Sequence, residues 1–489
     1  MSKRRSLGLV PLVSVGLFLV LALSGCKKDK SSSTTCTIGD PSSCSSGLVC
    51  EEVQGGDPTC FAPVVVRGQV FDATTDAGIA GASVVALDAN GAAVTVTATT
   101  DASGNYSLTV PAMRDATGAV LAASVTLRVD ASGYVSFPTP PRFALPIDLT
   151  AAVSMGGQLV VDSSVTDVSL FGIPAQIPAV TYGTIRGTIS GADAAGALVV
   201  AEQGAPAKAV STAIVGTDGT FVLYNVPINV ATNVTAYAAG VTVTSATATV
   251  TSAGTSVDVA LTADTTGLGT VSGSVNIVNP GNGSLTSVLL VVESTFDDVT
   301  KRGQVPVGLR AGNVSNAFTI ANVPAGKYVV LAAFENDFLV RDPDTTIGGT
   351  QIVHITVTAG GTITLSTSFK VTGALDHPVP GTTGLEVVTT PVTQFQWDDD
   401  SSEDGYEFRL YDAYGNEVVT ARNLDVPKHT GGQTVTYTPA SAITYTPGMV
   451  YQFRVLSFGC IMGNAFPCPS NRKYLSATED LLGVFQYQP

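Results

Sequence analysis

The chain has 489 residues, a formal net charge of −15 and only 13% charged residues. An acidic surface repels phosphate backbones, which argues against nucleic acid as a partner. The 464 residues after position 25 are enough for roughly three or four domains. Valine and threonine are abundant and β-branched, and helical periodicity is not sustained beyond the N-terminal segment, so the composition predicts an all-β protein.

The first 25 residues have the pattern of an export signal. Basic residues at 3–5 precede a 17-residue apolar run at 7–23, which is followed by Ser24-Gly25. A basic segment, a short apolar core and small residues at its end predict a signal peptide over 1–25. The alternative is an uncleaved signal anchor, because 17 residues lie at the lower edge of what can span a bilayer.

The segment Leu23-Ser24-Gly25-Cys26 resembles the lipobox of bacterial lipoproteins. The resemblance implies that Cys26 is lipidated, with palmitate among its acyl chains, and that membrane lipid is a partner. More than one acyl chain makes such anchoring stable. Residues 26–35 would then form a polar tether that spans about 15–20 Å as a random coil. Lys27, in place of aspartate, favours the outer membrane by the sorting rule of enteric lipoproteins, whereas the membrane face stays undetermined.

Besides Cys26, an even set of six cysteines remains: Cys36, Cys44, Cys50, Cys60, Cys460 and Cys468. Even numbers of cysteines in an exported chain indicate disulfides. The gaps between the first four are seven, five and nine residues, unlike the close pairs of a zinc site. We therefore expect a disulfide-rich module over 36–62, with three pairings open, and a separate Cys460–Cys468 bridge. The stretch 44–60 is similar to small disulfide modules that follow lipoboxes in other envelope proteins.

From residue 64 onward the chain repeats one pattern three times. Each repeat opens with an apolar-x-Gly-x-apolar strand, at 66–70, 185–189 and 271–275. A mostly apolar strand follows, and later comes a strand with an aromatic residue and a proline five or six positions after it. Alternation places the apolar pair and the glycine of the opening strand on one face, while later glycines and prolines mark turns and strand ends.

Thr100–Tyr106 (TDASGNY) and Thr217–Phe221 (TDGTF) are similar to the turn motif of carboxypeptidase-regulatory-like domains, which have a transthyretin- or prealbumin-like fold. The resemblance implies a β-sandwich for each repeat, at 64–174, 180–263 and 270–372. The third repeat lacks the turn motif and diverges most. The resemblance also implies a scaffold, because these domains accompany catalytic domains without carrying catalytic residues themselves.

The C-terminal segment, 373–489, is richer in aromatic residues. Phe395-Gln396-Trp397 and Tyr406–Tyr411 alternate as strands do, and Pro447–Val455 (PGMVYQFRV) follows. This spacing is similar to that of fibronectin type III domains, which implies a core position for Trp397 and a tyrosine corner at Tyr451. The predicted fold class is therefore all-β: tandem prealbumin-like and immunoglobulin-like β-sandwiches after a lipoprotein signal peptide and a small disulfide module.

The sequence indicates no catalytic site, cofactor or metal site. Its histidines, His354, His377 and His429, stand outside metal-binding patterns, and we expect His354 to face solvent from an alternating strand. The acidic run 398–404 has two interpretations. It could supply carboxylates to calcium, but Glu403 stands where an EF-hand loop needs glycine, so we prefer a solvated loop between two strands.

The predicted contact surface is an F–G loop at 457–474. Its apolar residues Phe458, Ile461, Met462 and Phe466 are unusual in an exposed connection, and a Cys460–Cys468 bridge would hold them in one shape. The alternative is a bridge that only stabilises a long loop, with Phe466 packed on the domain.

These features together predict a non-enzymatic lipoprotein of the cell envelope. It would be a structural or adhesion scaffold, a string of sandwiches that displays its C-terminal domain to an envelope glycan or protein. The alternative function is a carbohydrate-binding surface protein. Sugar recognition uses exposed aromatic side chains, so their exposure discriminates between the two functions.

Overall fold

A computed structural model describes residues 35–489 except 41, 175–180, 279–284, 299–300, 333–338, 342–351, 401, 420–424, 429–432, 462–464 and 469–471. This part of the chain contains 36 strands and two short 3-10 helices, η1 (Leu149–Ala151) and η2 (Glu293–Thr295), which confirms the all-β prediction. No helix in it is long and apolar enough to cross a membrane. The predicted signal peptide, Cys26 and the tether lie outside the described residues, apart from Thr35.

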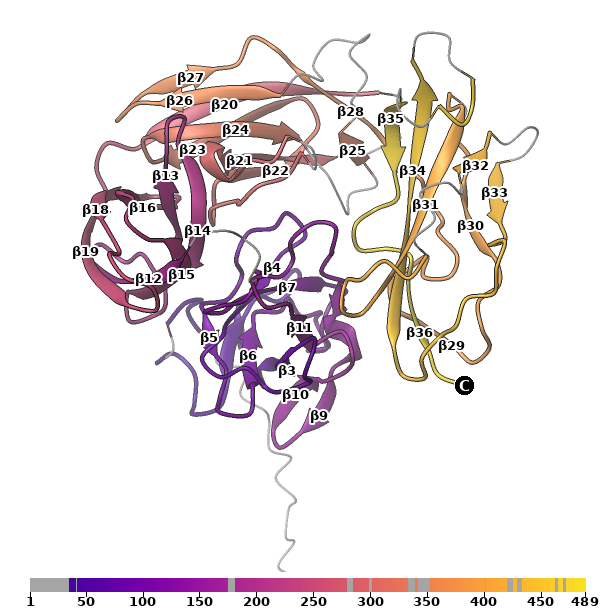
Figure 1. Cartoon of the computed structure of the whole chain (residues 1–489), viewed down its shortest axis with the longest axis horizontal. Coiled ribbons are helices and arrows are strands. Elements are labelled where there is room, and N and C mark those ends of the chain that lie inside the picture. Colours follow the sequence, from indigo (N-terminus) through magenta and orange to yellow (C-terminus); the bar gives the residue numbers. More distant parts are fainter. Residues whose placement is uncertain are drawn as a thin grey trace, which may run out of the picture.

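An N-terminal module and four sandwich units follow one another along the chain (Figure 1). We call 64–174 unit 1, 181–264 unit 2, 265–373 unit 3 and 374–489 unit 4. The module, 35–61, is built on a hairpin of β1 (Val49–Glu51) and β2 (Thr59–Phe61).

Units 1 and 2 are formed by seventeen of the strands. The strands of unit 1 are β3 (Val64–Asp72), β4 (Ser83–Leu87), β5 (Ala98–Thr99), β6 (Asn105–Val110), β7 (Ser124–Asp130), β8 (Ile147–Asp148), β9 (Val153–Met155), β10 (Gln158–Val161) and β11 (Val168–Leu170). The strands of unit 2 are β12 (Tyr182–Gly191), β13 (Leu198–Gln203), β14 (Lys208–Ile214), β15 (Thr220–Pro227), β16 (Thr232–Ala238), β17 (Val241–Thr244), β18 (Ala246–Ala248) and β19 (Ser256–Asp264). Unit 1 has one sheet ordered β11-β3-β10-β9, with β6 also on β3, and a second ordered β5-β4-β7-β8. In unit 2 a single sheet runs β14-β13-β16-β17-β19-β12-β15, with β18 also on β16.

Units 3 and 4 complete the chain. The strands of unit 3 are β20 (Gly269–Ile277), β21 (Thr286–Val292), β22 (Arg310–Val314), β23 (Ala317–Val323), β24 (Gly326–Ala332), β25 (Leu339–Arg341), β26 (Val353–Val357), β27 (Thr362–Thr364) and β28 (Phe369–Gly373). The strands of unit 4 are β29 (Glu386–Val388), β30 (Phe395–Asp398), β31 (Gly405–Asp412), β32 (Asp425–Pro427), β33 (Thr434–Tyr437), β34 (Val450–Cys460), β35 (Arg472–Ala477) and β36 (Val484–Tyr487). In unit 3 the sheet β23-β20-β28-β25 packs with β22-β21-β24-β26, and in unit 4 β34 is the centre of the larger sheet.

The three sequence repeats share one strand topology. The opening strand of each unit, β3, β12 or β20, pairs antiparallel with the aromatic strand of that unit. The same opening strand also pairs in parallel with strands near the end of its unit. The pattern read from the sequence therefore corresponds to one strand arrangement that is formed three times.

The glycine of each opening strand lies opposite the aromatic residue of its unit, and in units 2 and 3 it makes room for that ring. Gly68, Gly187 and Gly273 are the direct register partners of Tyr106, Phe221 and Phe318. A Cβ atom at Gly187 would lie 2.2 Å from Cζ of Phe221, and one at Gly273 would lie 2.8 Å from the ring of Phe318. Such separations are far inside van der Waals contact, so any larger residue would displace the ring from the core.

In unit 4, Trp397 and Tyr451 occupy buried positions. Trp397 is fully buried, which confirms its predicted place in the core, and its ring packs edge-on against Tyr406 at 5.5 Å. The hydroxyl of Tyr451 accepts a hydrogen bond from the backbone N–H of Thr446, five residues upstream, at 2.8 Å. That contact is the kind a tyrosine corner makes.

Several strands are buried on both faces, one face in their own unit and the other against a neighbour. In β13, Val199 and Ala201 belong to the core of unit 2, whereas Leu198 and Val200 join the core of unit 3. Unit 1 adds Val85 of β4 to that same core of unit 3. Strands covered on both sides read as unbroken apolar runs, which is how these segments read in the sequence.

In the described part of the chain the predicted tandem sandwiches are present, and they share their hydrophobic cores. Tyr411 and Val450 of unit 4 complete the core of unit 1, and the ring of Phe143 in unit 1 contacts Tyr411 at 5.1 Å. Units 1, 3 and 4 thus meet around a common centre, as Figure 1 shows. The physical reason is that apolar side chains on the outer faces of the sheets must be covered by another unit.

The guanidinium of Arg128 in β7 connects three units. It donates hydrogen bonds to Oε1 of Gln304 in unit 3 at 2.8 Å, and to the backbone oxygen of Thr212 in unit 2 at 2.8 Å. It also pairs with Asp130 of its own strand at 2.9 Å, and both side chains are largely buried. The buried guanidinium of Arg128 therefore donates hydrogen bonds to acceptors in units 1, 2 and 3, and these bonds hold the three units together at one point.

We predict that Arg128→Met weakens the joint between units 1, 2 and 3. The substitution keeps most of the side-chain volume but leaves Asp130 and the Thr212 oxygen without their buried donor, which should cost about 2–4 kcal/mol. Native-state hydrogen exchange of peptides from β7 and β14 measures the opening free energy. Arg186→Met, at an exposed position in β12, is the matched control and should change it by no more than about 0.5 kcal/mol. Equal exchange in both variants would contradict the role given to Arg128.

Candidate functional site

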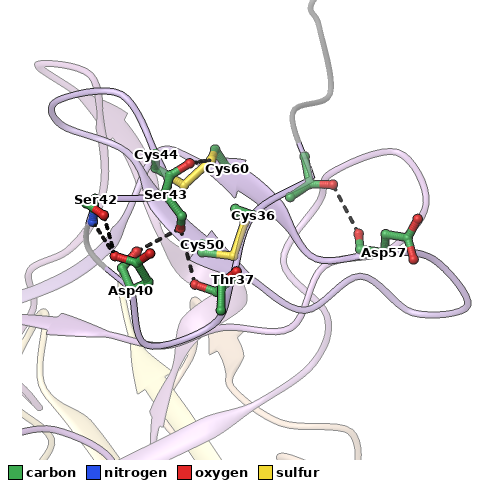
Figure 2. The surroundings of a disulfide bond; sticks show 10 residues. Cys36, Thr37, Asp40, Ser42, Ser43, Cys44, Cys50, Asp57 and Cys60 are labelled. Atoms are coloured by element: carbon green, nitrogen blue, oxygen red, sulfur yellow. Dashed lines mark hydrogen bonds between the residues drawn. A yellow bond between two sulfur atoms is a disulfide. The ribbon is translucent and has the colours of Figure 1, made fainter.

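Two disulfides stabilise the N-terminal module, which has little hydrophobic core of its own. Cys36 pairs with Cys50 and Cys44 with Cys60, so the structure selects one of the three pairings left open by the sequence (Figure 2). Around them, Asp40 accepts hydrogen bonds from the backbone and hydroxyl of Ser42 at 2.8 and 2.6 Å. Cys36, Cys44 and Cys50 lie close enough to hold a metal, but their sulfur atoms are used in these bonds.

A buried ion pair docks the module on unit 1. Nε of Arg114, in unit 1, lies 2.5 Å from Oε2 of Glu51 in β1, and both side chains are 2% exposed. Arg114 also donates to the backbone oxygen of Ala62 at 2.9 Å, and its guanidinium lies over the ring of Phe61, 4.9 Å from its centroid. Burial raises the pKa of Glu51, whereas the hydrogen bond and charge of Arg114 oppose that rise. No sequence pattern indicated this contact, since the two residues are 63 positions apart.

The predicted C-terminal loop begins later than expected, because β34 continues to Cys460. Cys460 and Cys468 form the predicted disulfide. Phe458 is a strand residue with no exposed surface, so its predicted role as an exposed loop contact is wrong: the ring of Phe466 and the guanidinium of Arg472 cover its side chain. Ile461 is 40% exposed, and Met462 lies outside the described residues.

Phe466 folds back onto unit 4. Its ring stacks on that of Phe458 with 6.3 Å between centroids, and a Cβ atom at Gly405 would lie 2.6 Å from it. Arg472 covers the other ring, with its guanidinium 4.1 Å from the centroid of Phe458. This packing corresponds to the alternative expectation, in which the bridge stabilises the loop and Phe466 rests on the domain.

The acidic run starts at Asp398, the last residue of β30, and its described residues 399–400 and 402–404 lie between β30 and β31, where their carboxylates hold local structure. Asp400 accepts a hydrogen bond from the hydroxyl of Ser457 at 2.6 Å. Asp399 accepts one from the hydroxyl of Tyr406 at 2.6 Å, and Asp404 accepts one from the backbone N–H of Cys460 at 2.7 Å. These contacts link the acidic loop to the base of the disulfide loop.

Glu403 differs from its acidic neighbours because it is buried. It is 1% exposed, and neither of its carboxylate oxygens has a hydrogen-bond partner in another described residue. Burial, reinforced by the charges of Asp399 and Asp400, raises the pKa of Glu403 to about 6. A buried carboxylate without donors is an energetic cost to the folded state once it ionises.

Two of the histidines lie in the described part of the chain. His354 is exposed as predicted, and its Nδ1 lies 3.1 Å from a carboxylate oxygen of Glu293. His377 is also exposed, with its Nδ1 2.8 Å from Asp398, and the hydrogen bond to Asp398 together with the charge of Asp376 raises the pKa of His377. The potential ligand atoms of Asp376, His377 and Asp398 lie within 4.8 Å of one another, a grouping that the sequence spacing did not indicate. His429 lies outside the described residues.

A cavity of about 380 Å³ lies where units 1, 3 and 4 meet. Its walls include the aliphatic side chains of Leu289 and Leu331 and the charged groups of Arg302, Arg454 and Asp480. Asp480 pairs with both arginines, so the polar rim of the cavity is an ion-pair network that joins units 3 and 4. The guanidinium of Arg454 also covers the ring of Phe143, 5.2 Å from its centroid, which leaves that aromatic face occupied.

Comparisons with known proteins identify no family: no family model and no curated protein matches the chain. Among solved structures, the Bacillus anthracis TIE protein matches at 13% identity and a TM-score of 0.15 over 63% of this chain, and the chain spans about half (51%) of that structure. The major pilin subunit BcpA of Bacillus cereus matches at 11% identity and 0.17, over 62% of this chain and 99% of that one. GBS52, the minor pilin of Streptococcus agalactiae, matches at 12% and 0.19, over 40% and 99%. At these scores the likenesses carry no argument about function.

We predict that Arg114→Met detaches the module from unit 1. Removing the cation leaves Glu51 buried and unpaired, which should lower the free energy of docking by about 3–5 kcal/mol. The double variant Glu51→Leu/Arg114→Met removes both charges and should recover most of that loss. Hydrogen exchange of peptides from 36–62 measures the effect. A single variant as protected as the wild type would contradict the prediction.

We predict that Glu403 makes unit 4 less stable as the pH rises. Because its pKa in the folded state, about 6, lies above the ordinary value of 4.5, folding favours the protonated form, and this stabilisation is lost between about pH 4.5 and pH 6. Glu403→Gln should flatten the pH dependence in that window and stabilise unit 4 at pH 7.5 by about 1–2 kcal/mol, allowing for solvent screening.

The fluorescence of Trp397, the only tryptophan in the chain, reports urea unfolding of unit 4 directly. Glu417→Gln, which also removes a half-buried carboxylate from unit 4, is the control and should not stabilise the unit at pH 7.5 as Glu403→Gln does. An unchanged pH profile for Glu403→Gln would refute the assignment.

Proposed function

We propose that the protein is a non-enzymatic, lipid-anchored scaffold of the cell envelope, with a structural or adhesive role. The observation that carries this proposal is the shared packing of the four units. Side chains from units 1 and 2 complete the core of unit 3, and those of unit 4 complete the core of unit 1. A body in which each unit covers the apolar face of another is suited to holding a fixed shape outside the cell.

The disulfides support a location outside the cytoplasm. All six cysteines in the described residues are paired, two pairs in the module and one in unit 4. Disulfides persist in oxidising compartments and are rare in the cytosol. With the N-terminal export pattern and the lipobox-like Leu23–Cys26, they favour a lipoprotein attached through Cys26, and Lys27 favours the outer membrane.

The distribution of aromatic side chains favours a scaffold over the alternative, a carbohydrate-binding protein. Among the described residues, only Phe171 and Tyr474 are exposed aromatics, and they belong to different units. Phe171 is covered by the guanidinium of Arg142 at 4.9 Å, and the hydroxyl of Tyr474 donates to Glu407 at 2.7 Å. One face of the Phe171 ring is therefore occupied and the hydroxyl of Tyr474 is engaged, which leaves few aromatic groups for stacking on a sugar.

The proposed anchoring predicts the behaviour of Cys26 variants expressed in a Gram-negative host. Cys26→Ala should leave a larger, uncleaved precursor without acyl chains, because the thiol is the attachment point. Detergent phase partitioning and intact mass measure both effects. Lys27→Asp is the control: it should still be cleaved and lipidated, but should fractionate with the inner membrane. An unchanged mass and unchanged partitioning of Cys26→Ala would overturn the lipid anchor.

A further inference from the structure

Exposed apolar side chains gather at one end of unit 1. Twelve large hydrophobic residues are exposed in the described part of the chain. Five of them belong to the module or to the neighbouring end of unit 1: Ile38, Leu48, Met113, Val153 and Met155. Val153 and Met155 have the greatest exposure of the five, at 58% and 52%, and both lie on β9.

Strand register places these residues at the same end. β10 runs parallel to β3 and begins beside its first residue, with Leu159 opposite Val64, so the β9–β10 turn projects beyond the start of β3. β6 runs antiparallel to β3 and ends there, with Val110 opposite Val64, so Met113 lies beyond the same end. The module joins β3 through residues 62–63 and is bridged to unit 1 between Val53 and Arg114.

β9 is an open sheet edge without the usual protection. Among the described strands it pairs only with β10, and all three of its residues are exposed. Edge strands of soluble proteins are commonly shielded by charged residues or covered by other elements. Two neighbouring apolar side chains on the same face of β9 therefore indicate that this edge contacts another surface. Nη1 of Arg67 lies 3.9 Å from the sulfur of Met155, so a cation stands beside the apolar group, as in many membrane-surface segments.

The short length of chain between Cys26 and the module indicates that this end of unit 1 lies near the membrane. Nine residues separate Cys26 from Cys36, and at full extension they reach about 35 Å. A lipid on Cys26 would therefore hold the module within that distance of the bilayer. Asp40, Glu52 and Asp57 are exposed on the module, and their negative charge disfavours strongly anionic lipid, so the fitting surface is zwitterionic.

We propose that the β9–β10 hairpin, 153–161, is a membrane-contact element, with Val153 and Met155 inserted at the boundary between headgroups and acyl chains of a zwitterionic bilayer. The proposal rests on the lipid anchor proposed above and adds an orientation to it. Unit 1 faces the membrane through the end that carries β9, which lies at the lower edge of Figure 1, and unit 3 lies on the opposite side.

The test uses the full-length lipidated protein in phosphatidylcholine vesicles that contain brominated acyl chains, which quench nearby tryptophan. Met155→Trp places a reporter on β9, and the matched control Leu285→Trp places one at a similarly exposed position before β21 in unit 3. Trp397 is buried in unit 4 and gives the same background in both. We expect brominated lipid to reduce the added emission of Met155→Trp at least about twofold and to leave that of Leu285→Trp unchanged.

Vesicle flotation separates the two proposals. Protein that floats with the vesicles while both reporters stay equally unquenched overturns the membrane contact and leaves the anchor intact. Protein that does not float overturns the anchor and the contact together. Circular dichroism of each variant checks that the fold is retained. As a second measurement, Val153→Ser/Met155→Ser should abolish the slowing of hydrogen exchange that vesicles cause in 153–161, and no slowing in the wild type would also overturn the contact.

Discussion

The architecture depends on sheets that have apolar side chains on both faces. A sandwich unit can cover only the inner face of each of its sheets, so an apolar outer face requires a second body. In unit 3 the alternate residues of β21 point to two different clusters: Leu290 into the core of the unit, and Leu289 toward Ala92 of unit 1 and Val305. Burying both faces excludes an extended arrangement and determines which unit must lie against which.

Polar contacts determine the relative orientation of the units, which apolar burial alone does not specify. Hydrophobic contact is non-directional, whereas a guanidinium has donors in fixed directions. Arg128 uses that property where units 1, 2 and 3 meet, and Arg142 does so between units 1 and 4, donating to the backbone oxygen of Tyr414 at 2.6 Å. Burial of apolar side chains therefore brings the units into contact, and the hydrogen bonds of these arginines determine how the units are oriented relative to one another.

Much of each unit could be predicted from the sequence, because its signals are local. The apolar-x-Gly-x-apolar strands, the aromatic strands opposite them and the buried Trp397 follow from alternation over a few residues. The arrangement of units could not be predicted, since it depends on pairs such as Arg128–Gln304, 176 residues apart. The apolar run Leu198–Ala201 did contain a signal, for a strand with no alternation needs cover on both faces.

In the candidate sites, too, the features that depend on nearby residues could be predicted, and those that depend on distant residues could not. The Cys460–Cys468 bridge could be predicted because its partners are eight residues apart, but Phe458 could not be placed without knowing that β34 extends to Cys460. Glu51 reads as an ordinary surface acid, and only the fold brings Arg114 to it. A static contact surface for a partner is therefore better sought on exposed edges such as β9 than in the disulfide loop, whose rings are largely turned inward.

Small-angle X-ray scattering of the mature chain tests the central claim, that the four units form one closed body. A closed body should have a radius of gyration close to that of a single globule of this length, about 23–28 Å. Four sandwiches end to end, each about 35 Å long from its longest strands, would give about 40 Å. A value near 40 Å, with a long tail in the distance distribution, would contradict the shared cores on which the proposed scaffold rests.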